Sequence, residues 1–220
     1  MVDNSGSGAV YKGLAMGTNG LDTLLYATNF AAGTVETYDA SFHSVNLGPG
    51  AFTDSQLPAG YAPFGIVNIN NSLYVTYALQ DATKHVAVPG PGNGYVDVYA
   101  TDGTLTTRLI ATGPLNAPWG VAMAPANFGP LSNMLLVGNF GDGKINAFDP
   151  STGAPAGQIT KANGKPLIIQ GLWALVFGDA QTGSPQTLFF TAGPNDQTAG
   201  LFGKIIFGKP KKMMGGGGGY

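Results

Sequence analysis

The chain contains no cysteine and few charged residues. Without cysteine it can form neither disulfides nor thiolate nucleophiles nor cysteine-based zinc sites. Only 10% of its residues are charged, against about 25% in an average soluble domain. The ten Lys and Arg residues are scattered apart from Lys209, Lys211 and Lys212. Because no basic stripe is present to contact a phosphate backbone, we predict no nucleic-acid partner.

Long hydrophobic runs and helical periodicity are also missing. No apolar run approaches the roughly 20 residues that a membrane-spanning helix needs, so we predict no transmembrane segment. Met1 leads straight into the short stretch 2–6, VDNSG, so we expect no signal peptide in this chain. Apolar residues do not recur at the spacing of a helix over any useful window, which leaves β-structure.

The composition is rich in turn formers and aromatic residues. There are 35 Gly and 15 Pro, and 44% of the residues are hydrophobic, with 12 Phe and 9 Tyr. That much apolar surface argues against disorder, since its burial offsets the loss of chain entropy. Short strands joined by Gly, Pro and Asn turns fit this composition best.

An internal repeat defines the architecture. The segment Asn29–Asp39 returns as Asn139–Asp149, with weaker copies at 94–99 and 200–205. Each unit opens with a short apolar segment centred on one small residue; these are Gly13, Gly65, Gly120 and Ala174, spaced by 52, 55 and 54 residues. Several short strands at a period near 53 predict an all-β fold, a β-propeller of four-stranded antiparallel blades.

Four blades can be counted, at about 11–60, 61–116, 117–170 and 171–207, followed by a flexible Lys/Met/Gly-rich tail at 208–220. Weak fourth strands are expected at Ser44–Leu47, Thr106–Ala111 and Gly157–Thr160, and none in the last unit. The N-terminal Gly8–Val10 could supply that missing strand and close the ring. Alternatively the ring is larger, and open blade edges would then drive self-association.

Several longer motifs resemble one family. They are Asn29-Phe30 with Gly33–Val35, Tyr61–Phe64, Gly90–Gly94, Pro118–Gly120, Val137–Gly143, Gly171–Leu175 and Thr191–Asn195. The chain resembles, over Val2–Ile206, uncharacterised bacterial β-propeller proteins that are often exported and often end in a PEP-CTERM sorting signal. Members are longer upstream by two further blades, so the chain is similar to their C-terminal two-thirds, and it lacks their sorting segment. The resemblance implies a six-bladed parent propeller and an extracellular or cell-surface location, but no activity.

Candidate functional residues lie where the propeller topology places one set of loops. The loops from second to third strands surround the mouth of the central channel, a usual ligand site. They are expected at Asn29–Gly33, Tyr77–Gly94, Asn139–Gly143 and Ala192–Gly200. The candidate ligand-binding residues of this rim are Asp81, Lys84, His85, Asp142, Asn195, Asp196, Trp119 and Trp173.

Two interpretations of the rim stay open. Asp81, Asp142 and Asp196 could supply oxygen ligands to Ca²⁺, or the rim could form a polar cup for a sugar or small acid. Alternatively, Asn and Asp occur there because they tolerate turn conformations. The tryptophans are best interpreted as blade anchors in the core, with sugar stacking as the second interpretation.

The long Tyr77–Gly94 loop breaks the repeat. It holds Asp81, Lys84 and His85, which could serve proton transfer or metal binding or form a solvated loop. The other histidine, His43, is expected on the opposite side, so a histidine-rich zinc site is not predicted.

The residues favour a non-enzymatic binding scaffold for a small molecule, a carbohydrate or a protein, with no catalytic residue and no cofactor. The alternative is a propeller hydrolase or lyase with Ca²⁺ or a small ligand at the channel rim.

Overall fold

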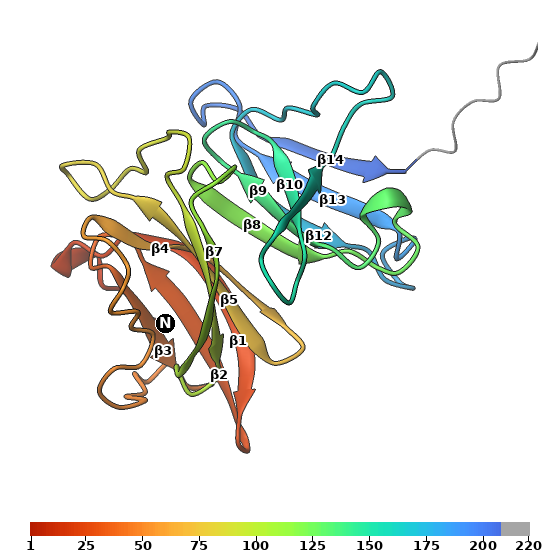
Figure 1. The fold of residues 1–220 in the computed structure, drawn as a ribbon. Coiled ribbons are helices and arrows are strands. Elements are labelled where there is room, and N and C mark those ends of the chain that lie inside the picture. Colours follow the sequence, from red (N-terminus) through yellow and green to blue (C-terminus); the bar gives the residue numbers. More distant parts are fainter. Residues whose placement is uncertain (208–220) are drawn as a thin grey trace, which may run out of the picture.

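The computed structural model describes residues 1–207, and the predicted tail at 208–220 lies outside them. The described chain folds into four antiparallel sheets that follow one another along the sequence (Figure 1). In each sheet the strands pair in chain order, as in the blade of a propeller. The four sheets are therefore called blades 1 to 4, which confirms the predicted all-β propeller architecture.

The strand bounds follow the repeat. Blade 1 contains β1 (Tyr11–Asn19), β2 (Asp22–Asn29) and β3 (Thr34–Tyr38). Blade 2 contains β4 (Tyr61–Ile69), β5 (Ser72–Leu79), β6 (Tyr95–Ala100) and β7 (Leu105–Ala111). Blade 3 contains β8 (Pro118–Met123), β9 (Leu135–Asn139), β10 (Ile145–Phe148) and β11 (Pro155–Gln158). Blade 4 contains β12 (Leu172–Phe177), β13 (Thr187–Ala192) and β14 (Leu201–Ile206). Two short 3₁₀ turns lie at Ser5–Ser7 and Gly129–Leu131.

Three expectations about the outer strands need correction. The strand expected at Ser44–Leu47 is reduced to one bridge between Tyr38 and Ser44, because the chain leaves the sheet after it. The outer strand of blade 3 begins at Pro155, two residues earlier than expected. The N-terminal Gly8–Val10 does not complete blade 4; the Val10 carbonyl accepts a hydrogen bond from the Phe30 N–H, beside β2 of its own blade.

Consecutive blades pack face to face through their innermost strands, β1 on β4, β4 on β8 and β8 on β12. Each interface has its own buried apolar cluster. Tyr26 and Val75 lie in the cluster between blades 1 and 2, Val96 and Val137 in that between blades 2 and 3, and Leu136 and Leu188 in that between blades 3 and 4. The core is thus a row of inter-blade layers.

A fourth cluster fills the centre, where the innermost strands converge. The Trp119 and Trp173 rings meet edge to face at 5.5 Å between centroids, and Phe140 lies 4.7 Å from Trp173. The Trp119 indole N–H donates to the carbonyl of Lys12, in blade 1, at 3.0 Å. The tryptophans therefore anchor blades to one another, as one of the two interpretations proposed. No helix within residues 1–207 is long and apolar enough to cross a membrane.

Candidate functional site

A hollow of about 460 Å³ opens where loops from three blades meet. It is lined by the second-to-third-strand loops of blades 2, 3 and 4 and by the segment that leads into blade 4. Its walls combine apolar side chains, glycine backbone and a few polar groups: Val86, Ala87, Pro89, Phe140, Gly141, Asp142, Gly143, Ile168, Gln170, Gly171, Gly193, Asp196 and Gln197. We call this the mouth hollow.

The mouth hollow collects part of the predicted rim. Asp142 and Asp196 line it, and Phe140 connects its floor to the central aromatic cluster through Trp173. Asp81, Lys84, His85 and Asn195 do not line it. The sequence did not predict that the apolar residues Val86 and Ile168 line the hollow. The apolar stretch 86–89, which follows the titratable residues, was the one feature that pointed to Val86.

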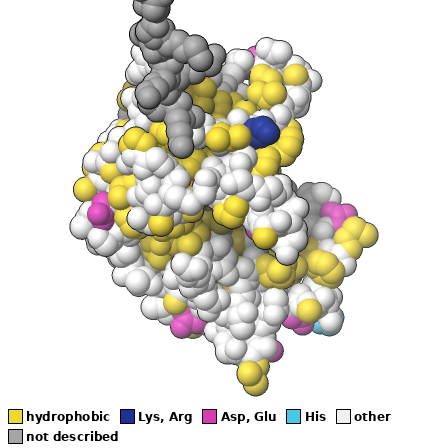
Figure 2. Space-filling model, turned by 90° about the vertical axis from the view of Figure 1, so that its right-hand side faces the viewer, with side chains coloured by type: hydrophobic (Ala, Val, Ile, Leu, Met, Phe, Trp, Pro, Cys, Tyr) yellow, Lys and Arg dark blue, Asp and Glu magenta, His cyan; other side chains and the backbone are white. Residues whose placement is uncertain are grey.

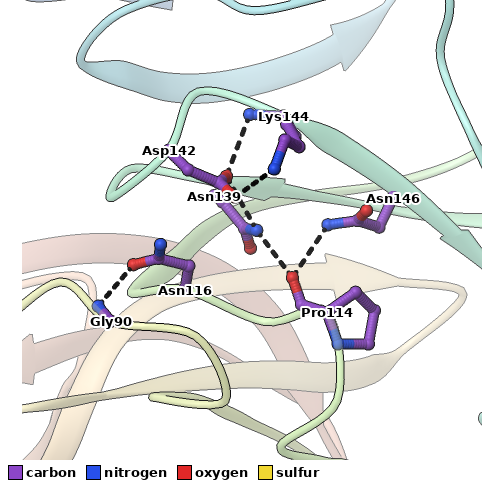
Figure 3. A network of polar contacts seen from close by, with 7 residues as sticks. All are labelled: Gly90, Pro114, Asn116, Asn139, Asp142, Lys144 and Asn146. Atoms are coloured by element: carbon purple, nitrogen blue, oxygen red, sulfur yellow. Dashed lines mark hydrogen bonds and ion pairs between the residues drawn. The ribbon is translucent and has the colours of Figure 1, made fainter. Parts of the chain in front are cut away.

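Asp142 is held by its own loop (Figure 3). Its carboxylate accepts hydrogen bonds from the Asn139 side-chain amide at 3.0 Å and from the Lys144 ammonium at 3.0 Å. The Lys144 backbone N–H also donates to it, at 3.2 Å. Most of its hydrogen-bonding capacity is thus directed back into the turn, as the turn interpretation of the rim predicts.

The Asn139 side chain ties this loop to the preceding blade connection. Its amide also donates to the Pro114 carbonyl at 2.9 Å, and Asn146 donates to the same carbonyl at 3.2 Å. Asn139 is fully buried, and its Oδ1 has no hydrogen-bond partner within residues 1–207. The network in Figure 3 therefore ties the Asn139–Gly143 loop to the connection between blades 2 and 3.

The long loop runs from residue 80 to 94, because β5 extends to Leu79. Asp81 closes a tight turn: it accepts the backbone N–H groups of His85 and Val86 and the Thr83 hydroxyl, at 3.0, 3.1 and 2.7 Å. The Thr83 hydrogen bond, followed by those from the backbone, holds the pKa of the exposed Asp81 carboxyl below its usual value. Lys84 and His85 are exposed on this turn. The predicted titratable cluster is a solvated turn.

Loop 80–94 is fixed at both ends. The Gln80 and Ala87 backbones form a bridge, and the Gln80 amide reaches the Phe30 carbonyl in blade 1. At the other end, Asn116 accepts the Gly90 N–H at 2.8 Å (Figure 3). Ala87 is buried between these ties, whereas Val86 is 54% exposed. The loop thus holds Val86 and Pro89 at the edge of the mouth hollow.

Within residues 1–207, no three His, Asp or Glu side chains are grouped closely enough to hold a metal ion. Asp81, Asp142 and Asp196 therefore do not form the three-carboxylate set considered from the sequence. His43 lies on an exposed turn, 3.2 Å from the Asp39 carboxylate, and takes no part in the mouth hollow. Charged side chains are sparse on the side of the molecule that Figure 2 shows, where hydrophobic side chains are spread over the surface.

A second polar cluster, which the sequence did not reveal, lies inside blade 2. The Arg108 guanidinium forms an ion pair with Asp54, and its Nε lies 3.7 Å from Asp97. Tyr99 donates to Asp97 at 3.3 Å, and its own hydroxyl is 2.7 Å from that of Tyr77. Burial, and then the Asp54 charge, raise the pKa of Asp97 to about 7. This cluster does not line the mouth hollow, and it fixes the β3–β4 connection onto blade 2.

The fold defines the class of protein: a row of β-propeller blades. It is similar to the α-L-arabinofuranosidase Arb93A from Fusarium graminearum, with a TM-score of 0.55 and 11% identity over 88% of this chain and 57% of that one. It is also similar to a chain of a nidogen/laminin complex, with a TM-score of 0.51 and 18% identity over 84% of this chain and 57% of that one. At these identities the likeness establishes the fold alone.

The chain is also similar in sequence to viral proteins. Two uncharacterised proteins of Acanthamoeba polyphaga mimivirus are 34% identical over 207 residues and 35% identical over 201 residues. The matches cover 92% and 89% of this chain but 53% and 48% of those proteins, so the chain spans about half the length of these relatives. No known family profile matches the sequence.

Proposed function

We propose that the chain is a non-enzymatic β-propeller binding module and that the mouth hollow receives a segment of a partner protein. The observation that carries the proposal is the lining of the hollow, which consists mainly of apolar side chains and glycine backbone and includes two carboxylates, those of Asp142 and Asp196. Val86 and Ile168 are 54% and 57% exposed there. Apolar side chains presented on fixed loops in a concavity are typical of a recognition surface.

The chemistry of the hollow favours a partner segment with one apolar side chain beside a hydrogen-bond donor or a cation. The apolar group would displace water from Val86, Pro89 and Ile168. The donor would meet Asp196, while Asp142 is already engaged by Lys144. A nidogen/laminin chain of the same fold is an instance of a propeller in a protein complex.

A peptide library displayed on phage and selected on the immobilised chain tests this proposal. Selected peptides should compete with one another and lose at least about tenfold in affinity on the Val86→Asp and Ile168→Asp variants. The control is Leu21→Asp, since Leu21 is fully exposed on the β1–β2 turn, away from the hollow. Peptides that bind all three variants equally would place recognition elsewhere and contradict the proposal.

One observation supports the hydrolase or lyase alternative: the arabinofuranosidase Arb93A shares the fold. In that case Asp142 and Asp196 would act on a glycoside in the hollow. Chromogenic glycosides give the test, since their turnover should then be lost in both Asp142→Asn and Asp196→Asn. A rise in melting temperature with Ca²⁺, abolished by the same substitutions, would likewise favour this alternative over the scaffold.

Export to the cell surface, which the family resemblance implies, is part of the same proposal. Its test is fractionation of the source cells with an antibody raised against the chain. Recovery in the cell interior alone would contradict it.

A further inference from the structure

The two ends of the blade row expose the faces that every internal blade buries. Because the blades are repeats, each end face can be compared with the internal faces at equivalent positions. Leu14, Ile66, Val121 and Leu175 each follow the small residue of an innermost strand. In blades 2, 3 and 4 this side chain contacts the preceding blade and is 7%, 4% and 4% exposed. Leu14, in blade 1, has no preceding blade and is 66% exposed.

The next position along the strand gives the opposite face. Ala15, Val67, Ala122 and Val176 are the equivalents. Ala15 and Ala122 are 9% and 7% exposed because the following blade covers them. Val176, in blade 4, is 60% exposed. Within residues 1–207, blade 1 thus lacks a neighbour on one face and blade 4 on the other.

Blade 4 also exposes a threonine hydroxyl whose equivalents in blades 1 and 2 contact the next blade. Thr28 and Thr76 are fully buried; Thr28 donates to the Phe64 carbonyl of the next blade at 3.0 Å, and Thr76 lies 3.5 Å from the equivalent Trp119 carbonyl. In blade 4 the same strand position is Thr191. Its oxygen accepts the Ala174 N–H, as that of Thr76 accepts the Gly65 N–H. Thr191 is exposed, with no next blade in front of it.

The end face of blade 4 is largely apolar, with the exposed Lys204 paired to Phe189 on the same face. Beside Val176 and Thr191, the Phe189 and Phe202 rings stack at 5.8 Å between centroids, and Phe202 is 71% exposed. The end face of blade 1 carries Leu14 and Met16 and a hollow of about 470 Å³, which Leu14, Leu25 and Tyr38 line together with the N-terminal Met1 and Val2. The two faces are those that meet at each junction inside the chain.

We propose that two copies of this chain associate head to tail, with the blade 4 face of each on the blade 1 face of the other. A copy of the chain supplies both complementary faces at once, in the relation that three internal junctions already display. Two such junctions related by a twofold axis close a ring of eight blades, within the range of about four to eight that propellers adopt. In the closed dimer the end faces of the described blades cover each other.

The test is the mass of the purified chain in solution, measured by light scattering on a sizing column over a range of concentrations. We expect twice the 22.5 kDa of one chain. A monomer at all concentrations, or a mass that grows without limit, would overturn the closed dimer.

Two variants separate the faces. Leu14→Asp and Val176→Asp should each abolish self-association and leave the circular dichroism spectrum unchanged, because both side chains are exposed in one chain. Mixed together, they should associate again, since the blade 4 face of the first and the blade 1 face of the second remain intact. Leu21→Asp should dimerise as the unmodified chain does. A Leu14→Asp variant that still dimerises would show like faces pairing and overturn the head-to-tail arrangement.

Discussion

Blade 2 and blade 4 both pair their strands in chain order but differ in how much of each is covered. Blade 2 has four strands, a neighbour on both faces and a buried ion-pair cluster at its outer side. Blade 4 has three strands, and its last strand, β14, is largely exposed. The same repeated sequence pattern thus has two outcomes. In blade 2 the small residue and the threonine hydroxyl contact the neighbouring blade, whereas in blade 4 the same positions face solvent. Substitutions at matched positions should therefore have unequal effects.

The largest difference is expected at the charged residues of the two blades. Arg108→Ala removes the cation that faces Asp54 and Asp97, of which Asp97 is fully buried. Loss of one partner of a buried ion pair costs about 3–5 kcal/mol. Urea unfolding should show this loss, whereas Lys204→Ala, on the exposed β14, should change stability by less than about 0.5 kcal/mol. Equal effects would mean that the cluster of blade 2 is not a stabilising contact.

The small residue of the innermost strand gives the next contrast. A Cβ on Gly65 would lie well inside van der Waals contact of the Trp119 carbonyl, which belongs to the next blade. We expect Gly65→Ala to lower the free energy of unfolding by about 1–3 kcal/mol, because the blade interface must move apart. At the matched position, blade 4 already carries Ala174. Ala174→Ser should cost little, and a thermal melt of both variants checks the pair.

These two contrasts show what the sequence predicted and what it could not. The period of Gly13, Gly65, Gly120 and Ala174 predicted the blades. Blades 1 to 3 have a small residue at this position because their innermost strands lie close to the backbone of the next blade. The sequence did not predict that Asp54, Asp97 and Arg108 meet, because 43 residues separate the first two and Asp54 lies in the β3–β4 connection, outside the repeated strands. The Asp residues in the sequence likewise indicated the rim of the mouth hollow. The sequence did not indicate that Ile168 would line the hollow with an apolar side chain.

The pH dependence of stability tests the blade 2 cluster in a second way. The pKa of Asp97 is raised to about 7 by burial, with contributions from Asp54 and, in the opposite sense, Arg108. In the unfolded chain the pKa of an Asp is about 3.9. The folded state therefore holds this proton more tightly than the unfolded state. The contribution is fully present below about pH 4 and is lost as the pH rises towards 7, with a slope of at most about 1.4 kcal/mol per pH unit.

Urea unfolding between pH 4 and pH 7 measures this slope. The groups facing Asp97 are Asp54, Arg108, Tyr99 and Tyr77, and the pKa values of both tyrosines are raised, so neither titrates in this window. Asp97→Asn should flatten the profile while the other carboxylates keep theirs. A variant with the same slope as the unmodified chain would assign the pH dependence to other groups.

The smallest contrast is expected at the threonines that face the next blade. Thr76 is buried, accepts the Gly65 N–H at 2.8 Å and lies 3.5 Å from the Trp119 carbonyl. Thr76→Val should cost about 1 kcal/mol, the typical net value of one hydrogen bond, because it leaves the Gly65 N–H buried without its acceptor. Thr191→Val removes the matched hydroxyl from blade 4, where water can replace it, and should leave the melting temperature of dilute protein unchanged. If Thr191→Val instead lowers the melting temperature only at concentrations where two copies associate, the hydroxyl acts across the junction between copies as Thr28 does between blades. The same pair of variants thus separates a contact within one chain from a contact between two.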